Sequence, residues 1–345
     1  MDREKSLAVK TTPKKAENTL QKLKNRKLLR TDLKVKKDKK HVYFPIQKKP
    51  TTTDFNIVTS KFEKLPEKKQ YYKDKINIPE EQKKLLPTSY DIIGKIILVK
   101  IPDELQQHKK EIGKALLKSH KNVETVYISK PVEGELRTRN VEIIAGENKT
   151  ETIHVEHGVK IKLDIEKTYF SPRLANERKH VARQVKTDET IVDMFTGVAP
   201  FPLVINHYSN PKKTYGIDKN PLAVKYANFN IKINKFKDKI KIFHGDAENI
   251  NEILPSNVEA DRVIMNLPFS SYKFLPAALK IMHKKCIFHY YEMIKEGNID
   301  KRINLIKKTA KKNNVYIENI DFREIKSYSP REFYIGFDIT AKKTK

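Results

Sequence analysis

Apolar and polar positions follow their most regular pattern in the second half of the chain. From residue 171 onward, short apolar segments alternate with longer segments whose apolar residues recur at helical spacing. We predict helices over 172–185, 200–207, 221–234, 273–282 and 300–312, and strands over 190–194, 214–217, 240–243, 261–265 and 286–291. Strands that alternate with helices are typical of a mainly parallel sheet. The last two apolar segments, 315–325 and 332–339, predict an antiparallel hairpin at the edge of that sheet.

The first half of the chain contains two smaller patterned regions. A strand–helix–strand unit is predicted from the segments 6–11, 13–29 and 42–46. A second α+β unit is predicted from strands over 92–101 and 123–128, a helix over 103–120 and a hairpin over 153–165. The stretch between them is polar and rich in Lys, Glu and Pro, which is typical of a linker. We therefore predict domains over 1–50, 86–170 and 171–345, with a linker over 51–85.

The charge of the chain indicates a polyanionic partner. Lys and Arg number 71 and Asp and Glu 43, which gives a formal net charge of +28. Residues 1–50 carry 17 of the basic and 5 of the acidic residues, so the first domain is strongly basic. A Lys-rich proteome is the alternative explanation; it accounts for abundant Lys more easily than for the shortage of acid.

The single cysteine and the absence of long apolar runs limit the kinds of site and the cellular compartment that we expect. Cys286 is alone, which excludes an intrachain disulfide and a Cys-rich zinc site, and we expect no metal site. No apolar run approaches the ~20 residues that span a bilayer, and no apolar core follows the charged start of the chain. We expect a cytoplasmic protein without a membrane partner.

Polar residues stand at the ends of four successive predicted strands. Asp193, Asp218, Asp246 and Asn266 end these strands or follow them closely. The carboxyl ends of parallel strands are where such sheets bind ligands, and an acid after the second strand suits ribose hydroxyls. Asp246 suits an adenine amino group, and Gly197 allows backbone to approach a ligand. Each acid alone could cap a helix, but together they favour a nucleoside. The Gly-x-Gly-x-x-Gly pattern of dinucleotide sites is absent, so a sulfonium nucleoside fits better.

Several motifs carry a resemblance to a known family. The segments 193–201 (DMFTGVAPF), 215–221 (YGIDKNP) and 265–268 (MNLP) resemble those of class I S-adenosylmethionine-dependent methyltransferases. More specific are GELRTR at 134–139, AGENKT at 145–150, YFSPRLANER at 169–178, HYY at 289–291 and KSYSPRE at 326–332. They resemble the archaeal and eukaryotic tRNA (guanine-37-N1)-methyltransferases over almost the whole chain. The chain departs from that pattern at Ala199, where the family usually has Gly, and at Ala175-Asn176, where a Gly pair is frequent.

The resemblance implies a fold, a cofactor and a partner. The fold is α/β, with a Rossmann-like, mainly parallel class I methyltransferase sheet, an antiparallel edge hairpin and two smaller N-terminal α+β units. The cofactor is S-adenosyl-L-methionine, and the partner is tRNA, bound by a chain that we expect to be a monomer. The basic domain would hold the outer corner of the tRNA, and the linker would act as a tether.

The resemblance also assigns roles to individual residues. Glu177 is the general base that removes the N1 proton of guanosine 37, and Arg137 stabilises O6. The implied cofactor-binding residues are Arg178, Asp193, Phe195, Gly197, Asp218, Lys219, Asp246, Ala247 and Asn266. The implied substrate-binding residues are Tyr169, Asn266, Pro268 and Arg331.

Alternatives remain open for these residues and for the reaction. From spacing alone, Glu177 is a helix-surface acid and Arg137 an exposed charge. Asn266-Leu-Pro-Phe269 resembles the Asn-Pro-Pro-Tyr loop of exocyclic-amine methyltransferases, but Leu267 replaces the first Pro and favours a ring nitrogen. The same scaffold could methylate a wyosine precursor at position 37, in addition or instead. A non-enzymatic tRNA-binding protein with a vestigial site is the alternative outside enzymes.

Overall fold

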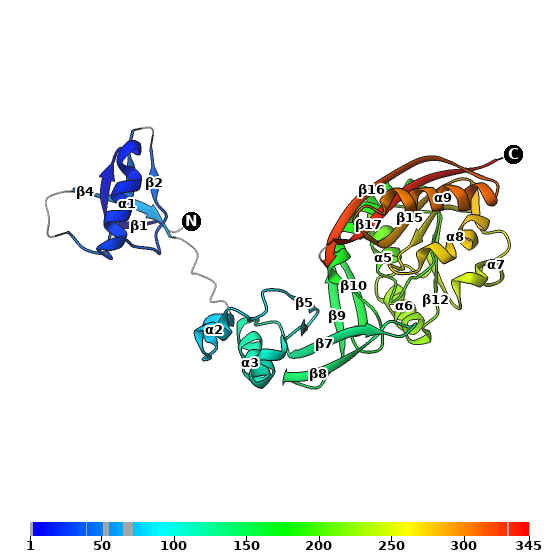
Figure 1. The fold of residues 1–345 in the computed structure, drawn as a ribbon, viewed down its shortest axis with the longest axis horizontal. Coiled ribbons are helices and arrows are strands. Elements are labelled where there is room, and N and C mark those ends of the chain that lie inside the picture. The colour runs from blue at the N-terminus through cyan, green and yellow to red at the C-terminus, as the bar shows by residue number, and fades with distance from the viewer. Residues whose placement is uncertain (1–2, 39, 51–54, 65–71, 330, 345) are drawn as a thin grey trace. The chain divides into compact units, whose positions relative to one another are not determined.

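The computed structural model describes residues 3–38, 40–50, 55–64, 72–329 and 331–344. The chain divides into two compact units, residues 1–74 and 75–345, and each is described by itself (Figure 1). No helix in the described part of the chain is long and apolar enough to cross a membrane.

The first unit is a four-stranded sheet with one helix. Its elements are β1 (Arg3–Thr11), η1 (Pro13–Lys15), α1 (Ala16–Asn25), β2 (Lys36–Lys37), β3 (Val42–Pro45) and β4 (Asn56–Glu63), and the strand order is β2-β3-β1-β4. Leu23 of α1 packs on Val9 and Phe44 of the sheet. The predicted strand–helix–strand order is confirmed, although the helix ends at Asn25.

The predicted linker over 51–85 is wrong at residues 56–63. These residues form β4, which pairs antiparallel with β1 from Arg3↔Glu63 to Lys10↔Asn56. Phe62 is fully buried against Ala8 and Leu33, so the segment contributes to a core despite its polar composition. Residues 51–54 and 65–71 of the predicted linker lie outside the described residues.

The second unit begins with a small mixed sheet. Its elements are α2 (Glu80–Lys83), β5 (Tyr90–Ile93), β6 (Ile96–Val99), η3 (Asp103–His108), α3 (Lys109–Ser119), β7 (Thr125–Glu133) and β8 (Thr138–Gly146), with strand order β5-β6-β7-β8. The single strand predicted over 92–101 is wrong, because Gly94, at φ 55°, turns the chain between β5 and β6. Strand β8 was not predicted, although it pairs with β7 and leads out of the segment that carries Arg137.

The predicted hairpin is confirmed as β9 (Glu151–Glu156) and β10 (Val159–Asp164). The sequence groups it with residues 86–170, yet Val159 and Ile161 pack in the core of the large sheet. Asn230 accepts from Lys162 N at 2.7 Å and donates to Lys162 O at 2.9 Å. Asn234 bonds the backbone of Lys160 in the same way. Two amide side chains one helical turn apart therefore satisfy backbone N–H and C=O groups along the edge of β10 that no described strand pairs with.

The large sheet has the predicted parallel order with an antiparallel edge. Its strands are β11 (Thr190–Asp193), β12 (Lys213–Asp218), β13 (Ile240–His244), β14 (Ala260–Met265), β15 (Met282–Lys295), β16 (Val315–Ser329) and β17 (Glu332–Lys343). The order is β13-β12-β11-β14-β15-β17-β16, where the first five strands are parallel and the last two form the predicted edge hairpin. Figure 1 shows this hairpin at the red end of the chain, with β16 and β17 side by side.

Helices cover both faces of the large sheet. η4 (Pro172–Leu174), α4 (Ala175–Gln184), α5 (Pro200–Tyr208) and α6 (Pro221–Ile233) pack on one face, while η5 (Ala247–Asn249), α7 (Ile250–Ile253), α8 (Ser271–Lys280) and α9 (Ile299–Lys312) pack on the other. Ile191 and Ile264 face the first group, and their neighbours Val192 and Val263 face the second. This alternation along buried strands fixes which face of the sheet each side chain reaches.

Candidate active site

A cavity opens at the carboxyl ends of β11 to β14. The segment 135–137 and the loop 169–171 complete its wall. Most of the residues predicted from the sequence line it: Arg137, Tyr169, Arg178, Phe195, Gly197, Asp218, Lys219, Asp246, Ala247 and Asn266. Asp193, Glu177, Pro268 and Arg331 are not part of this lining.

The loop after β11 forms the floor of the cavity. Gly197 has φ 54°, and Ala199, which precedes α5, has φ 68° and ψ 36°. Ala199 thus adopts the left-handed conformation that Gly takes most easily, so the loop is kept at a cost of about 1 kcal/mol. Asp193 is 1% exposed and accepts from Phe195 N at 3.3 Å. Burial raises the pKa of Asp193 to about 7. Its hydrogen bond from Phe195 N supports the loop, and a cofactor contact for it stays a prediction.

Asp218 joins two loops at the end of β12. Its Oδ2 accepts from Gly197 N at 2.6 Å, and its Oδ1 accepts from Asn220 N at 2.9 Å. Burial raises the pKa of Asp218 although both hydrogen bonds favour the carboxylate. The acid is therefore fixed in orientation at the cavity wall, where an acid after the second strand suits ribose hydroxyls.

Lys219 crosses the rim of the cavity. Its Nζ lies 3.0 Å from Asp246 Oδ2 and also bonds Glu135, from the segment that carries Arg137. The hydrogen bond with Glu135, followed by that with Asp246, raises the pKa of Lys219. Asp246 also accepts from Glu248 N at 3.0 Å, and this bond is the main cause of its lowered pKa. The rim therefore connects the small mixed sheet to the large one.

Arg137 lies on an aromatic face at the mouth of the cavity. The centre of its guanidinium is 4.2 Å from the ring centroid of Tyr169 and 5.9 Å from that of Phe269. The described part of the chain offers this guanidinium no hydrogen bond that would occupy its donors. A cation held by stacking, with its N–H groups available, suits the recognition of an oxygen that gains negative charge.

Arg178 is buried in an ion pair and is only 1% exposed. Its Nε donates to Glu156 Oε1 at 2.6 Å, and one Nη donates to Ser171 O at 3.1 Å. The guanidinium thereby ties α4 to the hairpin strand β9. Arg178 borders the cavity, but these contacts occupy much of its donor capacity, and a direct cofactor contact for it stays a prediction.

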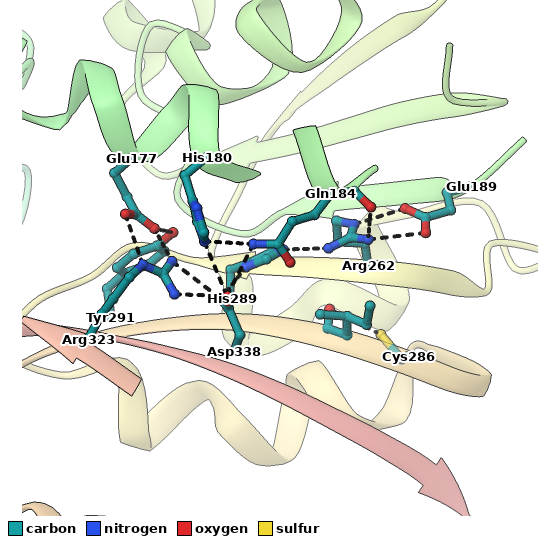
Figure 2. A network of polar contacts seen from close by, with 11 residues as sticks. Glu177, His180, Gln184, Glu189, Arg262, Cys286, His289, Tyr291, Arg323 and Asp338 are labelled. Atoms are coloured by element: carbon teal, nitrogen blue, oxygen red, sulfur yellow. Dashed lines mark hydrogen bonds and ion pairs between the residues drawn. The ribbon is translucent and has the colours of Figure 1, made fainter. Parts of the chain in front are cut away.

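Glu177 lies on the other side of α4 and is 7% exposed. Tyr291 Oη donates to its Oε1 at 2.8 Å, and Arg323 Nε donates to its Oε2 at 3.2 Å (Figure 2). The alternative of a helix-surface acid is therefore wrong. Tyr291 stacks on Tyr334, whose hydroxyl bonds Asn266 Oδ1 at the cavity wall, so aromatic residues connect Glu177 to the cavity.

The last two predicted substrate residues lie outside the cavity lining. Pro268 is buried, and its carbonyl accepts from Met293 N at 2.7 Å. Arg331 is exposed on the turn before β17. Sequence reasoning missed Arg323, Tyr334 and Phe274. Phe274 packs edge-on against Phe195. The residues next to these three in the sequence are apolar or typical of a strand, and they form no motif that indicates a functional site.

The class of protein follows from the sheet order and from what lies at its carboxyl ends. Five parallel strands closed by an antiparallel hairpin, with Asp218 and the Gly197 loop beside a partly apolar cavity, define a class I S-adenosylmethionine-dependent methyltransferase. Three family models match the chain: the TRM5/TYW2 methyltransferase domain at 152–318, the TYW2 N-terminal domain at 72–150 and the tRNA methyltransferase 5 N-terminal domain at 8–54. The chain belongs to the TRM5/TYW2 family of methyltransferases.

Named relatives and solved structures cover nearly the whole chain. It is 38% identical to Trm5b, a tRNA (guanine(37)-N(1))-methyltransferase of Pyrococcus abyssi, over 96% of this chain and 98% of that one. It is 35% identical to the Trm5b of Methanocaldococcus jannaschii, over 98% and 99%. The crystal structure of the Pyrococcus abyssi Trm5b matches with a TM-score of 0.76 and 37% identity over 98% and 99%. A complex of aTrm5 with tRNALeu matches with a TM-score of 0.71 and 34% identity over 97% and 99%.

Proposed function

We propose that this methyltransferase transfers the methyl group of S-adenosylmethionine to N1 of guanosine at position 37 of tRNA. The names of the two Trm5b relatives support this reaction. The observation that carries it is that the cavity region holds both groups. Arg137 lies at the mouth, where no described residue occupies its guanidinium donors, and Glu177 is a buried carboxylate linked to the cavity wall through Tyr291 and Tyr334.

The acceptor atom explains why both groups are needed. Guanine N1 carries a proton and becomes nucleophilic only when that proton leaves, while negative charge gathers on O6. Glu177 takes the proton, and Arg137 donates hydrogen bonds to O6. Bound S-adenosylmethionine supplies an electrophilic methyl group on a sulfonium that is a good leaving group. Asp218 would bind the ribose hydroxyls of the cofactor, and the Gly197 loop would hold its nucleoside part.

The tRNA is bound at two places. A base beside the anticodon is stacked and must flip out to enter a pocket. The flipped base would meet Tyr169 and Phe269, whose rings lie beside the Arg137 guanidinium. The first unit carries clustered Lys and Arg side chains, among them Arg3, Lys5, Lys34, Lys36 and Lys61 around one groove. Binding there raises the effective concentration of the anticodon arm at the cavity.

A wyosine precursor at the same position is the second candidate substrate. A Nanoarchaeum equitans relative that is 31% identical over 74% of this chain is named a tRNA (guanine(37)-N(1))/4-demethylwyosine(37)-methyltransferase. Phe269 is 58% exposed and its ring lies 5.9 Å from the Arg137 guanidinium, so it belongs to the part of the cavity mouth that a larger tricyclic base would contact.

The test is methyl transfer to unmodified tRNA transcripts, followed by mass spectrometry of the nucleosides. We expect 1-methylguanosine with G at position 37 and none when that G is replaced. Formation of N2-methylguanosine would contradict the proposal. A transcript that carries 4-demethylwyosine tests the second substrate in the same assay.

Glu177→Gln separates the base role from binding. It should lower the single-turnover rate of methyl transfer by about 100-fold or more, because general bases contribute roughly 10²–10⁴, and it should leave tRNA affinity within about twofold. The matched control is Glu292→Gln, since Glu292 is also a buried carboxylate held by a tyrosine and an arginine, Tyr290 and Arg302. A parallel loss of tRNA binding in Glu177→Gln would contradict the base role.

A further inference from the structure

A row of polar side chains joins α4 to the edge hairpin of the large sheet. Glu177, His180 and Gln184 are spaced to lie on one face of α4, and all three contact Arg323 of β16 or Asp338 of β17. Figure 2 shows them converging on these two residues from above. Of these three residues, Glu177 is the proposed general base.

Asp338 is the centre of this network. It accepts from His289 Nδ1 at 2.7 Å, from Arg323 Nη1 at 2.8 Å and from Gln184 Nε2 at 3.1 Å. Burial alone would raise the pKa of Asp338, but the hydrogen bonds from His289 and Arg323 outweigh it and the pKa is lowered. Asp338 is therefore a permanent carboxylate with little freedom to turn.

The other ring nitrogen of His289 is fixed as well. Arg262 Nη1 lies 2.6 Å from His289 Nε2, and because Arg can only donate, Nε2 is the acceptor. The ring proton is therefore on Nδ1, which donates a hydrogen bond to Asp338. Burial lowers the pKa of His289, which agrees with a neutral ring. Arg262 is held in turn by Glu189, at 2.8 and 3.1 Å.

Arg323 thus has two carboxylates, one on each side of its guanidinium. Nε and one Nη bond Glu177, while the other Nη bonds Asp338. Burial alone would lower the pKa of Arg323, but the hydrogen bonds to Glu177 and Asp338 raise it, so its charge is fixed. When Glu177 takes a proton and becomes neutral, the Arg323 cation still faces Asp338 and is not left as an unpaired buried charge.

We propose that Arg323 is a positioning residue for Glu177: anchored by Asp338, it fixes the orientation of the carboxylate toward the acceptor base. This inference rests on the proposed function, because it needs Glu177 to act as the base. Arg323 touches neither substrate nor cofactor in this role. The anchored guanidinium holds the carboxylate of Glu177 in one orientation, as a supporting residue does for a group that acts in catalysis.

A purely structural role is the competing explanation, since Arg323 also joins β16 to α4. A double-mutant cycle distinguishes the two. If Arg323 acts through Glu177, its replacement changes little once Glu177 is already Gln. If it only supports the fold, the two losses multiply.

The experiment uses the full chain as wild type, Arg323→Gln, Arg323→Lys, Glu177→Gln and the double variant. Single-turnover methyl transfer, tRNA and S-adenosylmethionine affinities, and melting temperatures are measured for each. The matched control is Arg302→Gln, which breaks another pair between an arginine and a buried glutamate, at 2.5 Å and away from the cavity lining. This control should lower the melting temperature and leave the methyl-transfer rate within about twofold.

We expect Arg323→Gln to slow methyl transfer by about tenfold or more with both affinities within about twofold, and Arg323→Lys to recover part of the rate. In the Glu177→Gln background, Arg323→Gln should add less than about twofold. A full multiplicative loss, or an Arg323→Gln variant as fast as wild type, refutes the positioning role. Wild-type chain that forms no 1-methylguanosine refutes the proposed function and this inference with it; the product of the wild type therefore tells the two failures apart.

Discussion

Replacing Asp193 by Asn should stabilise this protein at neutral pH. Asp193 lies at the end of β11, is 1% exposed and has a pKa raised to about 7 by burial. Asn keeps the shape and an oxygen that accepts from Phe195 N, but it removes the charge that the site disfavours. The substitution therefore isolates the free-energy cost of one buried carboxylate.

The size of the stability difference and the pH range in which it develops both follow from the raised pKa of Asp193. A shift from 3.8 to about 7 is about 3 units, and at 1.36 kcal/mol per unit this amounts to about 4 kcal/mol. Below pH 4 the acid is protonated in both the folded and the unfolded chain, so it contributes nothing. Between pH 4 and 7 the folded chain keeps a proton that the unfolded chain releases, so the wild type loses stability as the pH rises. The full difference is reached above about pH 7.

Urea unfolding of the cofactor-free chain from pH 4 to 8.5, followed by circular dichroism, measures this difference. The transition of the larger unit is compared between Asp193→Asn and wild type, with the exposed Asp238→Asn as the control for a surface carboxylate. We expect the advantage of Asp193→Asn to grow from near zero to about 4 kcal/mol across the window. A difference that does not change with pH, or a less stable variant at pH 8, would refute the reasoning.

Two further substitutions test the cofactor site and the fold. Asp218→Asn should weaken S-adenosylmethionine binding by about 10- to 100-fold in calorimetry, because it removes a charged acceptor that is held by Gly197 and Asn220; an unchanged affinity would argue against a ribose contact. Gly94→Ala should destabilise the chain by about 3 kcal/mol or more in thermal unfolding, since the new Cβ would lie 2.3 Å from Thr152 Oγ1 at φ +55°. Gly297→Ala, at φ +77° with no atom within 4 Å, serves as its control and should cost about 1 kcal/mol.

The sequence predicted those parts of the fold in which local pattern and burial agree. Every helix and strand predicted from residue 171 onward is present, because the central parallel strands are buried and the helices pack apolar residues on the two faces of the sheet. Strand β4 was missed because Phe62 is its one fully buried side chain, and its other apolar residues, Ile57 and Val58, are adjacent rather than alternating. The turn at Gly94 was missed because apolar residues continue on both sides of it.

The same limit applies to the site. Asp218, Asp246 and Asn266 were found because each ends a strand or follows it within two residues, a relation that is visible in a short stretch of sequence. Arg323 lies 146 residues from Glu177, and a charged residue in a strand gives no sign of its partner. Contacts of that kind depend on the order of strands in the sheet, which no local pattern contains.

The neighbouring tyrosines of β15 restrict how the length of this strand can change during evolution. Tyr291 points to the face that holds Glu177, and Tyr290 points to the opposite face, where it bonds Glu292. Because side chains alternate along a strand, inserting or deleting one residue before Tyr290 would exchange the two faces. Glu177 would lose its tyrosine and the opposite layer would gain a misplaced one. Length variation in related chains should therefore fall in the turn around Gly297 rather than within this strand.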